Sequence, residues 1–515
     1  MFEYFLVIVS ATTLSLCFTK TIPGIVSFIA LLPFKFAIDR CKAYQAKGLG
    51  FVWGLSFFLL LLWWLVPTIS TYGALPKPLS ALVLLALCSY LAIYPSFWAH
   101  IYKKFAYSSI NPILLIFAGS ALWILLEYIR SILFSGFPWG SIGYSLATYP
   151  FLIQTADIWG VYGIGFFIVF VNISIGSFFD KNLEKNNVHL FMMVFSITVF
   201  AAFFIYYGLH KKSLPFKKGF WAAAIQGSID QSIKWNPFFT KSTINIYKSL
   251  TKRAKKTYPD LKLVVWPETS MPFYFQEENL LRKDILSFSK KNEIYILFGS
   301  PSYTYGKDNK PKYLNSAYLI SPKGQVLGKY DKQHLVPFGE YMPFGSLTEW
   351  ARKFLPTAGD FIPGTKSGPI GDDNISIGVM ICFESIFPYI SRQEVLLGAE
   401  LLTIITNDAW FGKTPAPWQH ANMATFRAVE TRRWIIRAAN TGISRIISPS
   451  GQILTESDLF KPEIIGAKIE RLKQKTIYVR FGPYWFLVIN LLIVIIALKK
   501  VFLSERRKGY EQKNK

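Results

Sequence analysis

Long apolar segments constrain the fold of this chain more than any other feature of its sequence. A segment of about 20 apolar residues is long enough for a helix to cross the hydrocarbon core of a bilayer. The sequence predicts seven such spans within 1–210, an eighth helix at 483–500 and a polar tail at 501–515. The eight apolar segments are 1–18, 22–39, 50–70, 79–101, 111–133, 157–178, 188–208 and 484–498. We therefore expect a multi-pass α-helical membrane domain of about eight transmembrane helices.

The connections between these segments differ in their content of Lys and Arg, which are enriched in short cytoplasmic loops. The connections that are richer in Lys and Arg follow the second, fourth, sixth and eighth segments. They hold Lys35, Arg40, Lys42, Lys47, Lys103, Lys104, Lys181, Lys185, Arg506, Arg507 and Lys508. The alternate connections hold Lys20, Lys77 and Arg130. This bias predicts that both termini are cytoplasmic and that region 218–480 faces the other side, which is the periplasm for a bacterial inner (cell) membrane.

The overall composition agrees with membrane spans joined to a water-facing domain. Hydrophobic residues make up 52% of the chain and the mean hydropathy is +0.30, which is too apolar for one soluble domain. The formal charge is +25, but Lys and Arg are spread along the chain with no basic-aromatic motif of a nucleic-acid module. The charge therefore favours anionic lipid headgroups, and we expect no nucleic-acid partner.

Region 218–480 has a different pattern, in which short apolar runs typical of strands alternate with amphipathic helical stretches. The predicted strands are 220–226, 261–266, 294–299, 316–320, 375–381, 401–405 and 443–447. The clearest predicted helices are 238–255 and 418–434. A region of about 260 residues is long enough for one full core, so we expect one α/β layered domain.

Three of the apolar runs end at a charged or reactive side chain: Glu268, Lys332 and Cys382. A thiol needs a base or a nearby cation to become a thiolate nucleophile. Glu268 could accept the Cys382 proton, and Lys332 could favour the thiolate and then stabilise an oxyanion. Taken singly, each has a plainer interpretation: a surface carboxylate, a solvated lysine and a small buried hydrophobe.

Histidine is a competing base, because His334 and His420 both lie in this domain and a Cys–His pair is a known arrangement. Neither has an obvious orienting carboxamide motif. Two isolated histidines also fall short of a metal site, and the four cysteines are too dispersed for a disulfide framework or a Cys-x-x-Cys site. The sequence predicts no metal and no cofactor.

Taken together, the three strand-end motifs resemble those of the nitrilase superfamily. The matching motifs are Trp266-Pro267-Glu268, Lys332 before 335–340, and Ile381-Cys382-Phe383-Glu384. With spans on both sides, the chain resembles the apolipoprotein N-acyltransferase family over essentially its whole length. Further stretches that look like motifs of that family are 226–235, 335–341, 406–412 and 437–442.

The resemblance implies a fold and a set of site residues. The fold is a nitrilase-like four-layer α-β-β-α sandwich. Glu268 acts as base, Lys332 as the oxyanion-stabilising cation and Cys382 as nucleophile. Glu340, Phe383 and Glu384 are supporting residues, and Trp235, Tyr341 and Trp410 contact or shape the substrate site. Phe383 is a departure from the family, whose well-known members carry Tyr at this position. Phe383 keeps the backbone N–H that would help to stabilise an oxyanion, but it lacks the Tyr hydroxyl and any role of that group.

The resemblance also implies a reaction, which is ping-pong acyl transfer through a Cys382 thioester. The donor is a phospholipid, phosphatidylethanolamine by family resemblance, and the acceptor is the N-terminal amine of a diacylglyceryl-cysteine apolipoprotein. We expect a membrane-embedded monomer. Apolar residues between Tyr341 and Phe361 predict a lid in the membrane interface. The alternatives are a membrane-tethered nitrilase-type amidohydrolase acting on small amides and a transporter or binding protein with a degenerate domain.

Overall fold

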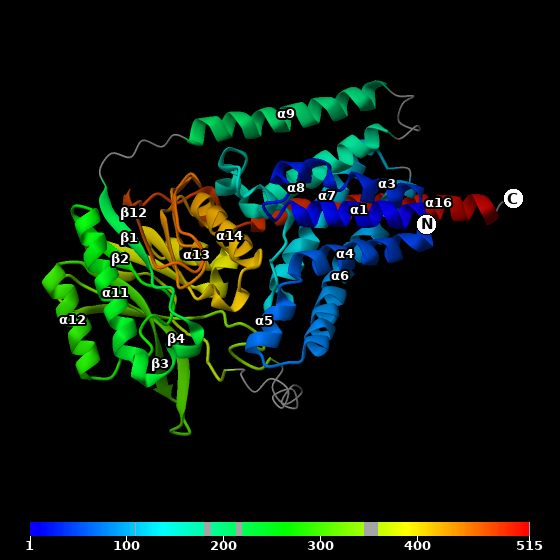
Figure 1. The fold of residues 1–515 in the computed structure, drawn as a ribbon. Helices are drawn as coiled ribbons and strands as arrows, with labels where there is room; N and C mark the ends of the chain where they lie inside the picture. The colour runs from blue at the N-terminus through cyan, green and yellow to red at the C-terminus, as the bar shows by residue number, and fades with distance from the viewer. Residues whose placement is uncertain (109, 180–186, 213–218, 344–358, 514–515) are drawn as a thin grey trace. The chain divides into compact units, whose positions relative to one another are not determined.

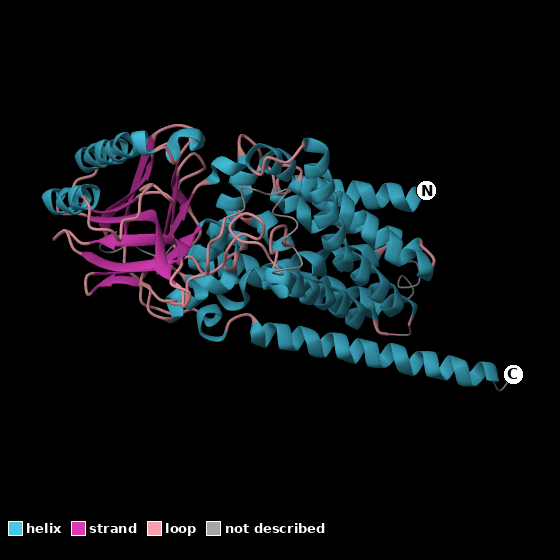
Figure 2. Cartoon of the chain, turned by 90° about the horizontal axis from the view of Figure 1, so that it is seen from below, coloured by secondary structure: helices cyan, strands magenta, loops and turns pink. Residues whose placement is uncertain are grey.

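The computed structural model describes residues 1–108, 110–179, 187–212, 219–343 and 359–513. The chain forms two compact units (Figure 1). One unit comprises Met1–Val66, Pro78–Lys212 and Phe481–Lys515, and the other comprises Pro67–Lys77 and Ser213–Arg480. Helices make up the first unit, while the strands all lie in the second, as Figure 2 shows for the described residues.

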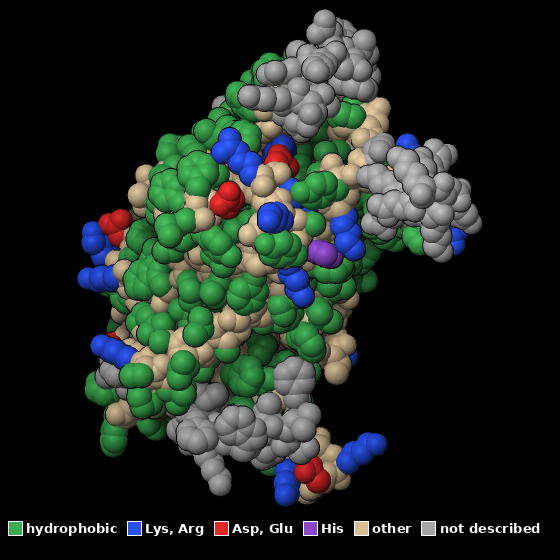
Figure 3. Space-filling view, turned by 90° about the vertical axis from the view of Figure 1, so that its right-hand side faces the viewer, with side chains coloured by type: hydrophobic (Ala, Val, Ile, Leu, Met, Phe, Trp, Pro, Cys, Tyr) green, Lys and Arg blue, Asp and Glu red, His purple; other side chains and the backbone are tan. Residues whose placement is uncertain are grey.

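Apolar helices dominate the first unit. They are α1 (Phe2–Leu16), α2 (Ser27–Ala30), α3 (Leu32–Arg40), α4 (Ala46–Leu62), α6 (Lys77–Tyr107), α7 (Pro112–Ile132), α8 (Ala156–Phe178), α9 (Asn187–Lys212) and α16 (Tyr484–Lys513). The short helix α5 (Leu65–Tyr72) spans the boundary between the units. Many large apolar side chains of the helical unit are exposed, and Figure 3 shows a face on which hydrophobic side chains predominate among scattered Lys and Arg. Such a surface is suited to lipid.

Five helices in the described residues are long and apolar enough to cross a membrane. They lie at Ala43–Leu62, Lys77–Tyr107, Pro112–Ser135, Ala156–Phe178 and Tyr484–Ser504. Two shorter apolar helices, Phe2–Leu16 and Ile197–Lys211, correspond to the first and seventh predicted spans. The structure therefore supports a multi-pass helical region, but it does not confirm the predicted count of about eight.

The predicted span 22–39 is not one helix in the structure. It is divided into a 3-10 turn at Gly24–Val26, helix α2 and helix α3, and Pro33 occupies the first turn of α3. Proline lacks the N–H that would continue a helix from the preceding turn. At 1.5 Å per residue, the nine residues of α3 fall well short of a hydrocarbon core of about 30 Å.

Two six-stranded sheets form the framework of the second unit. The first has the order β12-β1-β2-β3-β4-β5 and the second β11-β10-β9-β8-β7-β6. The strands of the first sheet are β1 (Phe220–Gln226), β2 (Leu261–Val265), β3 (Tyr295–Tyr305), β4 (Pro311–Ile320), β5 (Val326–Asp331) and β12 (Glu463–Ile469). Those of the second are β6 (Ile370–Asp372), β7 (Ile375–Ile381), β8 (Leu401–Thr406), β9 (Ile435–Ala439), β10 (Arg445–Ile447) and β11 (Ile453–Glu456).

The sheets and helices form four layers. Side chains of both sheets share one core, in which Leu263 and Leu297 of the first sheet meet Val379 and Ile405 of the second. Helices α11 (Pro237–Thr257) and α12 (Leu280–Asn292) cover the outer face of the first sheet. Helices α13 (Pro388–Leu396) and α14 (Ala416–Thr431) pack on the second sheet. The predicted α-β-β-α sandwich is confirmed.

Local differences from the predicted elements have identifiable causes. The predicted helix 418–434 ends at Thr431, because Arg432 is left-handed with a φ of 50°. The chain then enters strand β9, which was not among the predicted strands. The apolar run 443–447 pairs only over Arg445–Ile447. Two short helices complete the unit, α10 (Gln231–Lys234) and α15 (Ile477–Phe481).

Strand direction determines where the site lies. Strands β1, β2 and β3 are parallel, and so are β7, β8 and β9. The carboxyl ends of parallel strands share one edge of a sheet, where α/β folds bind their ligands. Glu268 follows β2, Lys332 follows β5 and Cys382 follows β7.

Candidate active site

Cys382 follows β7 directly and begins a short 3-10 helix that ends at Ile386. Its φ of 53° is left-handed, a conformation that costs a non-glycine residue about 1–3 kcal/mol and that clusters at functional sites. The Ser385 hydroxyl donates to the Cys382 carbonyl oxygen at 2.9 Å and so stabilises the turn. The Thr406 side chain, at the end of β8, lies near the thiol and lowers its pKa. The sharp turn therefore places the thiol beyond the buried strand.

Glu268 is a buried carboxylate held by neutral donors. Its Oε1 accepts from the Asn315 side-chain amide at 2.7 Å, and its Oε2 accepts from the Asn407 backbone N–H at 2.8 Å. Only 6% of the residue is exposed. Both bonds leave lone pairs on the carboxylate, so Glu268 retains the capacity to accept a proton.

Lys332 is 1% exposed and pairs with Glu340, whose Oε2 lies 2.8 Å from Nζ. The Val336 N–H donates to the same carboxylate at 2.9 Å. The Asn315 amide donates to Glu340 at 3.1 Å as well as to Glu268. Asn315 thus links the two carboxylates and fixes the spacing between the expected base and the Lys332 ion pair.

The electrostatics of the site keep the thiol neutral and the lysine charged. Burial raises the pKa of the Cys382 thiol, nearby Glu268 raises it further, and Lys332 opposes this increase only in part. Burial would lower the pKa of Lys332, but the charges of Glu340, Glu268 and Cys382 outweigh burial and raise it above its usual value. A nucleophilic role for this thiol would therefore require a base that takes its proton during the attack.

Glu384 ties the Cys382 turn to the chain segment that carries Lys332. Its Oε2 accepts from the Ile381 N–H at 2.7 Å, and its Oε1 accepts from the N–H groups of Gln333 at 2.7 Å and His334 at 3.1 Å. The Tyr330 hydroxyl donates to both oxygens. Glu384 is fully buried, and its hydrogen bonds hold the Cys382 turn beside the Lys332 segment.

Replacing Glu384 with Gln is expected to destabilise the fold, because an amide NH₂ would face a backbone N–H that loses its acceptor. An unsatisfied buried donor costs about 1–3 kcal/mol. Burial raises the pKa of Glu384 to about 7, against the N–H groups and Lys332, which lower it. The native carboxyl therefore contributes more stability at pH 5 than at pH 8. Thermal unfolding of both proteins in detergent should show a larger difference at pH 5, and an equal difference at both pH values would contradict this assignment.

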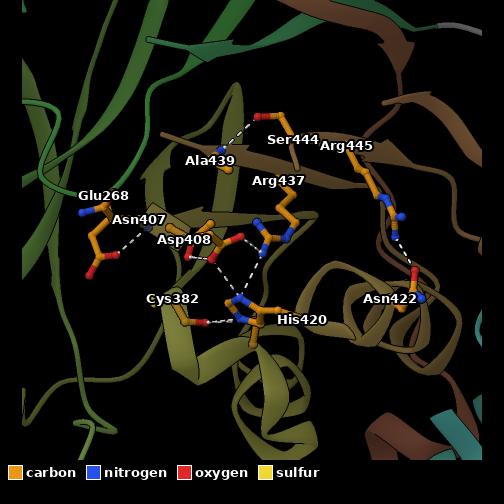
Figure 4. A network of polar contacts seen from close by, with 12 residues as sticks. Glu268, Cys382, Asn407, Asp408, His420, Asn422, Arg437, Ala439, Ser444 and Arg445 are labelled. Carbon is orange, nitrogen blue, oxygen red and sulfur yellow. Dashed lines mark hydrogen bonds and ion pairs between the residues drawn. The ribbon is translucent and has the colours of Figure 1, made fainter. Parts of the chain in front are cut away.

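A buried polar network supports the Cys382 turn from the second sheet (Figure 4). Asp408 accepts from the Thr406 hydroxyl at 2.8 Å and from Arg437 at 2.8 Å, and His420 Nδ1 lies 3.0 Å from it. His420 Nε2 lies 3.1 Å from the Cys382 carbonyl oxygen. Burial would raise the pKa of Asp408, but Arg437 and His420 hold it well below its usual range. Asp408 is therefore an ionised carboxylate that supports the Cys382 turn through His420.

Neither histidine is placed as a base for the thiol. His420 contacts the Cys382 carbonyl oxygen and the Ser385 hydroxyl. His334 stacks on Phe387 with ring centroids 3.8 Å apart, and its Nδ1 lies 2.9 Å from the Tyr389 hydroxyl. Burial and Lys332 lower the pKa of His334 to about 4, so this ring is neutral at physiological pH.

The residues expected to contact substrate differ in their surroundings. Trp235 is 52% exposed and follows the buried Lys234. Trp410 is 37% exposed, and its ring packs edge-on against Tyr72 at 4.8 Å. Tyr341 is partly buried, and its carbonyl oxygen accepts from the Phe338 N–H. The apolar segment expected to form a lid lies mostly within 344–358, outside the described residues.

Phe383, the departure from the family pattern, is partly buried. Its ring packs edge-on against Phe387 at 5.2 Å and lies 5.9 Å from the His334 ring. Phe383 thus takes part in an aromatic cluster beside the Lys332 segment, a packing role that requires no hydroxyl.

Sequence reasoning missed three side chains that the structure brings to the site: Asn315, Asn407 and Lys234. Asn315 is an isolated amide in the buried part of β4, and that polar residue in an apolar strand was the available signal. Lys234 and Asn407 lie within 226–235 and 406–412, two stretches that resemble motifs of the family. Their common partner, Glu268, is distant from both in sequence. Across the described ranges, no group of three or more His, Cys, Asp or Glu side chains is arranged to hold a metal ion.

Comparisons with known proteins cover both units. Residues 221–476 match the carbon-nitrogen hydrolase family, and residues 10–174 match the apolipoprotein N-acyltransferase N-terminal domain. An apolipoprotein N-acyltransferase of Geobacter metallireducens is 39% identical over 490 residues, 93% of this chain and 92% of that protein. One of Rhizobium leguminosarum bv. trifolii is 30% identical and covers 90% and 88%. A crystal structure of a carbon-nitrogen hydrolase from Helicobacter pylori G27 is 21% identical, covers 48% of this chain and 88% of that chain, and has a TM-score of 0.37.

Proposed function

The chain belongs to the apolipoprotein N-acyltransferase family, and from this we propose that it acylates the N-terminal amine of lipoproteins through a thioester on Cys382. The observation that carries the proposal is the family match over 93% of the chain, which includes both the apolar helices and the Cys382 site. A soluble amidohydrolase would need the site but not the helices. The proposed acyl donor and acceptor are both lipid-linked, which gives the helical unit a purpose.

The first half-reaction loads the acyl chain onto the cysteine. Glu268 takes the Cys382 proton while Sγ attacks the ester carbonyl carbon of a phospholipid. The carbonyl oxygen becomes an oxyanion, which Lys332 and the Phe383 N–H stabilise. Collapse of the tetrahedral intermediate breaks the ester bond, and Glu268 returns its proton to the departing glycerol oxygen. A lysophospholipid leaves, and the acyl chain remains as a thioester.

The second half-reaction delivers the acyl chain to an amine. The α-amino group of a diacylglyceryl-modified cysteine attacks the thioester carbonyl, Glu268 accepts the amine proton, and the proton then passes to the Cys382 sulfur as it leaves. The products are an N-acylated lipoprotein and the free thiol. Trp235, Tyr341 and Trp410 are proposed to contact the substrates. Water must be kept from the thioester for the amine to compete.

The finer assignments are part of the same proposal. The donor is phosphatidylethanolamine, attacked at its sn-1 ester, and the enzyme works as a monomer in the bacterial inner membrane. The catalytic unit faces the periplasm and both termini are cytoplasmic, as the distribution of Lys and Arg predicts. A periplasmic site would meet lipoproteins after their diacylglyceryl group has been attached.

Mass spectrometry of a lipoprotein N-terminus tests the function directly. Purified protein in vesicles of phosphatidylethanolamine should add one acyl chain to a diacylglyceryl apolipoprotein, and the mass of the acceptor should rise by that chain. Vesicles of phosphatidylglycerol alone test the donor assignment in parallel. An unchanged acceptor mass, together with ammonia release from small amides, would replace the proposal with the amidohydrolase alternative.

A further inference from the structure

A second buried lysine lies beside the expected base. Lys234 ends the short helix α10 and is 1% exposed. Its Nζ donates to the Glu268 carbonyl oxygen and to the Thr269 hydroxyl, each at 3.1 Å. A buried ammonium is costly unless charges or hydrogen bonds compensate for the water it loses. Its position next to Glu268 therefore requires an explanation.

The pairing of charges in the site supplies that explanation. Lys332 is matched to Glu340 at 2.8 Å. Within the described part of the chain, Glu268 forms no ion pair and its oxygens accept from the neutral groups of Asn315 and Asn407. Lys234 lies within electrostatic range of Glu268 and Cys382. Lys332 also interacts with Glu268, but its ion pair is with Glu340, so Lys234 supplies a second positive charge beside Glu268.

The turn that carries Glu268 also needs support. Thr269 has a φ of 47°, a left-handed conformation that is strained for a β-branched residue. The turn lies against β3 so closely that a Cβ added at Gly299 would come within 2.4 Å of the Thr269 nitrogen. Lys234 donates to both residues of this turn, so one side chain stabilises the turn and places a positive charge beside the carboxylate.

Two asparagines hold the Lys234 segment in place. The Asn407 side chain donates to Gln231 at 2.7 Å, while its backbone N–H binds Glu268. The Asn440 side chain accepts from the Ile229 N–H at 2.9 Å and donates to the Ile229 carbonyl oxygen at 2.8 Å. Asn407, at the end of β8, therefore connects the Lys234 segment directly to Glu268.

We propose that Lys234 is a positioning residue of the acyl-transfer reaction, whose ammonium keeps Glu268 as a carboxylate able to take the Cys382 proton. This inference rests on the proposed function for the reaction in which Lys234 takes part, whereas the contacts of Lys234 do not depend on that function. Without Lys234, the two carboxylates Glu268 and Glu340 would share the charge of Lys332. The charged and titratable groups around the site include Lys332 and Glu340 in the segment after β5, the neutral Cys382 thiol and Glu384 after β7, and Asp408 after β8.

The charge state of Lys234 is compatible with this role. Burial lowers the pKa of Lys234 to about 8, against Glu268 and Cys382, which raise it. The ammonium is therefore mostly protonated at pH 7. Arg keeps its charge at all relevant pH values, while Gln retains N–H donors without a charge. The two substitutions separate the charge from the hydrogen bonds.

The test is the rate of Cys382 alkylation by iodoacetamide as a function of pH, measured by peptide mass spectrometry on full-length protein in detergent. This reaction needs a deprotonated base but no lipid. The acidic limb is the low-pH part of this profile, where the alkylation rate falls as the pH falls. For Lys234→Gln, we expect the acidic limb to move to higher pH by about one unit, so that alkylation at a pH on this limb is about tenfold slower than in the wild type. Lys234→Arg and Thr269→Val, which retain the positive charge, should keep the wild-type limb.

Coincident limbs for Lys234→Gln and wild type would overturn the proposal, as would an equal shift in Thr269→Val. Thermal unfolding in detergent confirms that each variant is folded. Acyl transfer measured in parallel separates the two proposals. A shifted limb in a protein whose wild type acylates no lipoprotein would overturn the function and leave Lys234 assigned. Normal acylation by the wild type, together with an unshifted limb in Lys234→Gln, would support the function and overturn the assignment of Lys234.

Discussion

Cys382→Ala is expected to abolish the acyl-enzyme and to lower acyl transfer by about 10⁴-fold or more, as loss of a nucleophile does in other covalent catalysts. Ala cannot form the thioester, so no second route to the product exists within the proposed scheme. Incubation with a phospholipid carrying a labelled acyl chain, followed by denaturing gel electrophoresis, should label the wild type and leave the variant unlabelled. Hydroxylamine should release the label, because a thioester is cleaved under conditions that leave amides intact.

Cys41→Ala provides the matched control. Cys41 is a buried thiol of the helical unit with no role in the proposed reaction. This variant should label like the wild type. Labelled Cys382→Ala, or a label that maps to another residue, would refute the covalent scheme.

The second large effect is expected for Glu340→Gln, which removes the counter-ion of Lys332. Breaking a buried ion pair on one side costs about 3–5 kcal/mol, because the remaining charge is left uncompensated. The variant should lower the free energy of unfolding by this amount at pH 7. Loss or displacement of one oxyanion donor should also reduce the turnover number by about 10²–10³-fold.

The pH dependence of this loss has a definite sign. In the wild type, the pKa of Lys332 is raised above 10.5, the usual lysine value. The stability that this gives is fully present below pH 10.5 and is lost only at higher pH. Without Glu340, burial should bring the pKa below that value, so the variant gains stability as pH rises towards 10.5. The difference in unfolding midpoint in detergent should therefore be smaller at pH 9 than at pH 7.

A surface pair provides the control for this substitution. Lys248 lies 2.7 Å from Asp284, whose side chain is 47% exposed. Asp284→Asn should change stability by about 1 kcal/mol or less and should leave turnover unchanged, because water screens an exposed pair. If Glu340→Gln were as mild as Asp284→Asn, the ion pair could not be the support that holds Lys332 in its charged form.

Sequence patterns placed two of the expected residues at strand ends, because apolar runs precede Glu268 and Cys382, whereas Lys332 follows β5, which was not among the predicted strands. Glu268 and Cys382 follow β2 and β7, and those two strands fall close to their predicted ranges. The patterns did not reveal Asn315, which bridges Glu268 and Glu340, because a single amide in a strand has no partner that spacing can identify. The count of membrane helices was also beyond the sequence, because hydropathy alone does not decide whether the apolar segment 22–39, which prolines interrupt, forms one helix or two.

The sequence by itself determined that this chain joins apolar helices to a layered α/β unit with a thiol, a carboxylate and an amine at strand ends. Hydropathy and periodicity are local properties, so they can be read without knowing what lies opposite. Only the tertiary structure decided how the charges are matched: Lys332 with Glu340, and Lys234 beside Glu268. Those partners come from different strands, and Asn407 reaches Glu268 across 139 positions of sequence. Burial by both sheets then makes the matching necessary, because a charge removed from water must find its compensation within the protein.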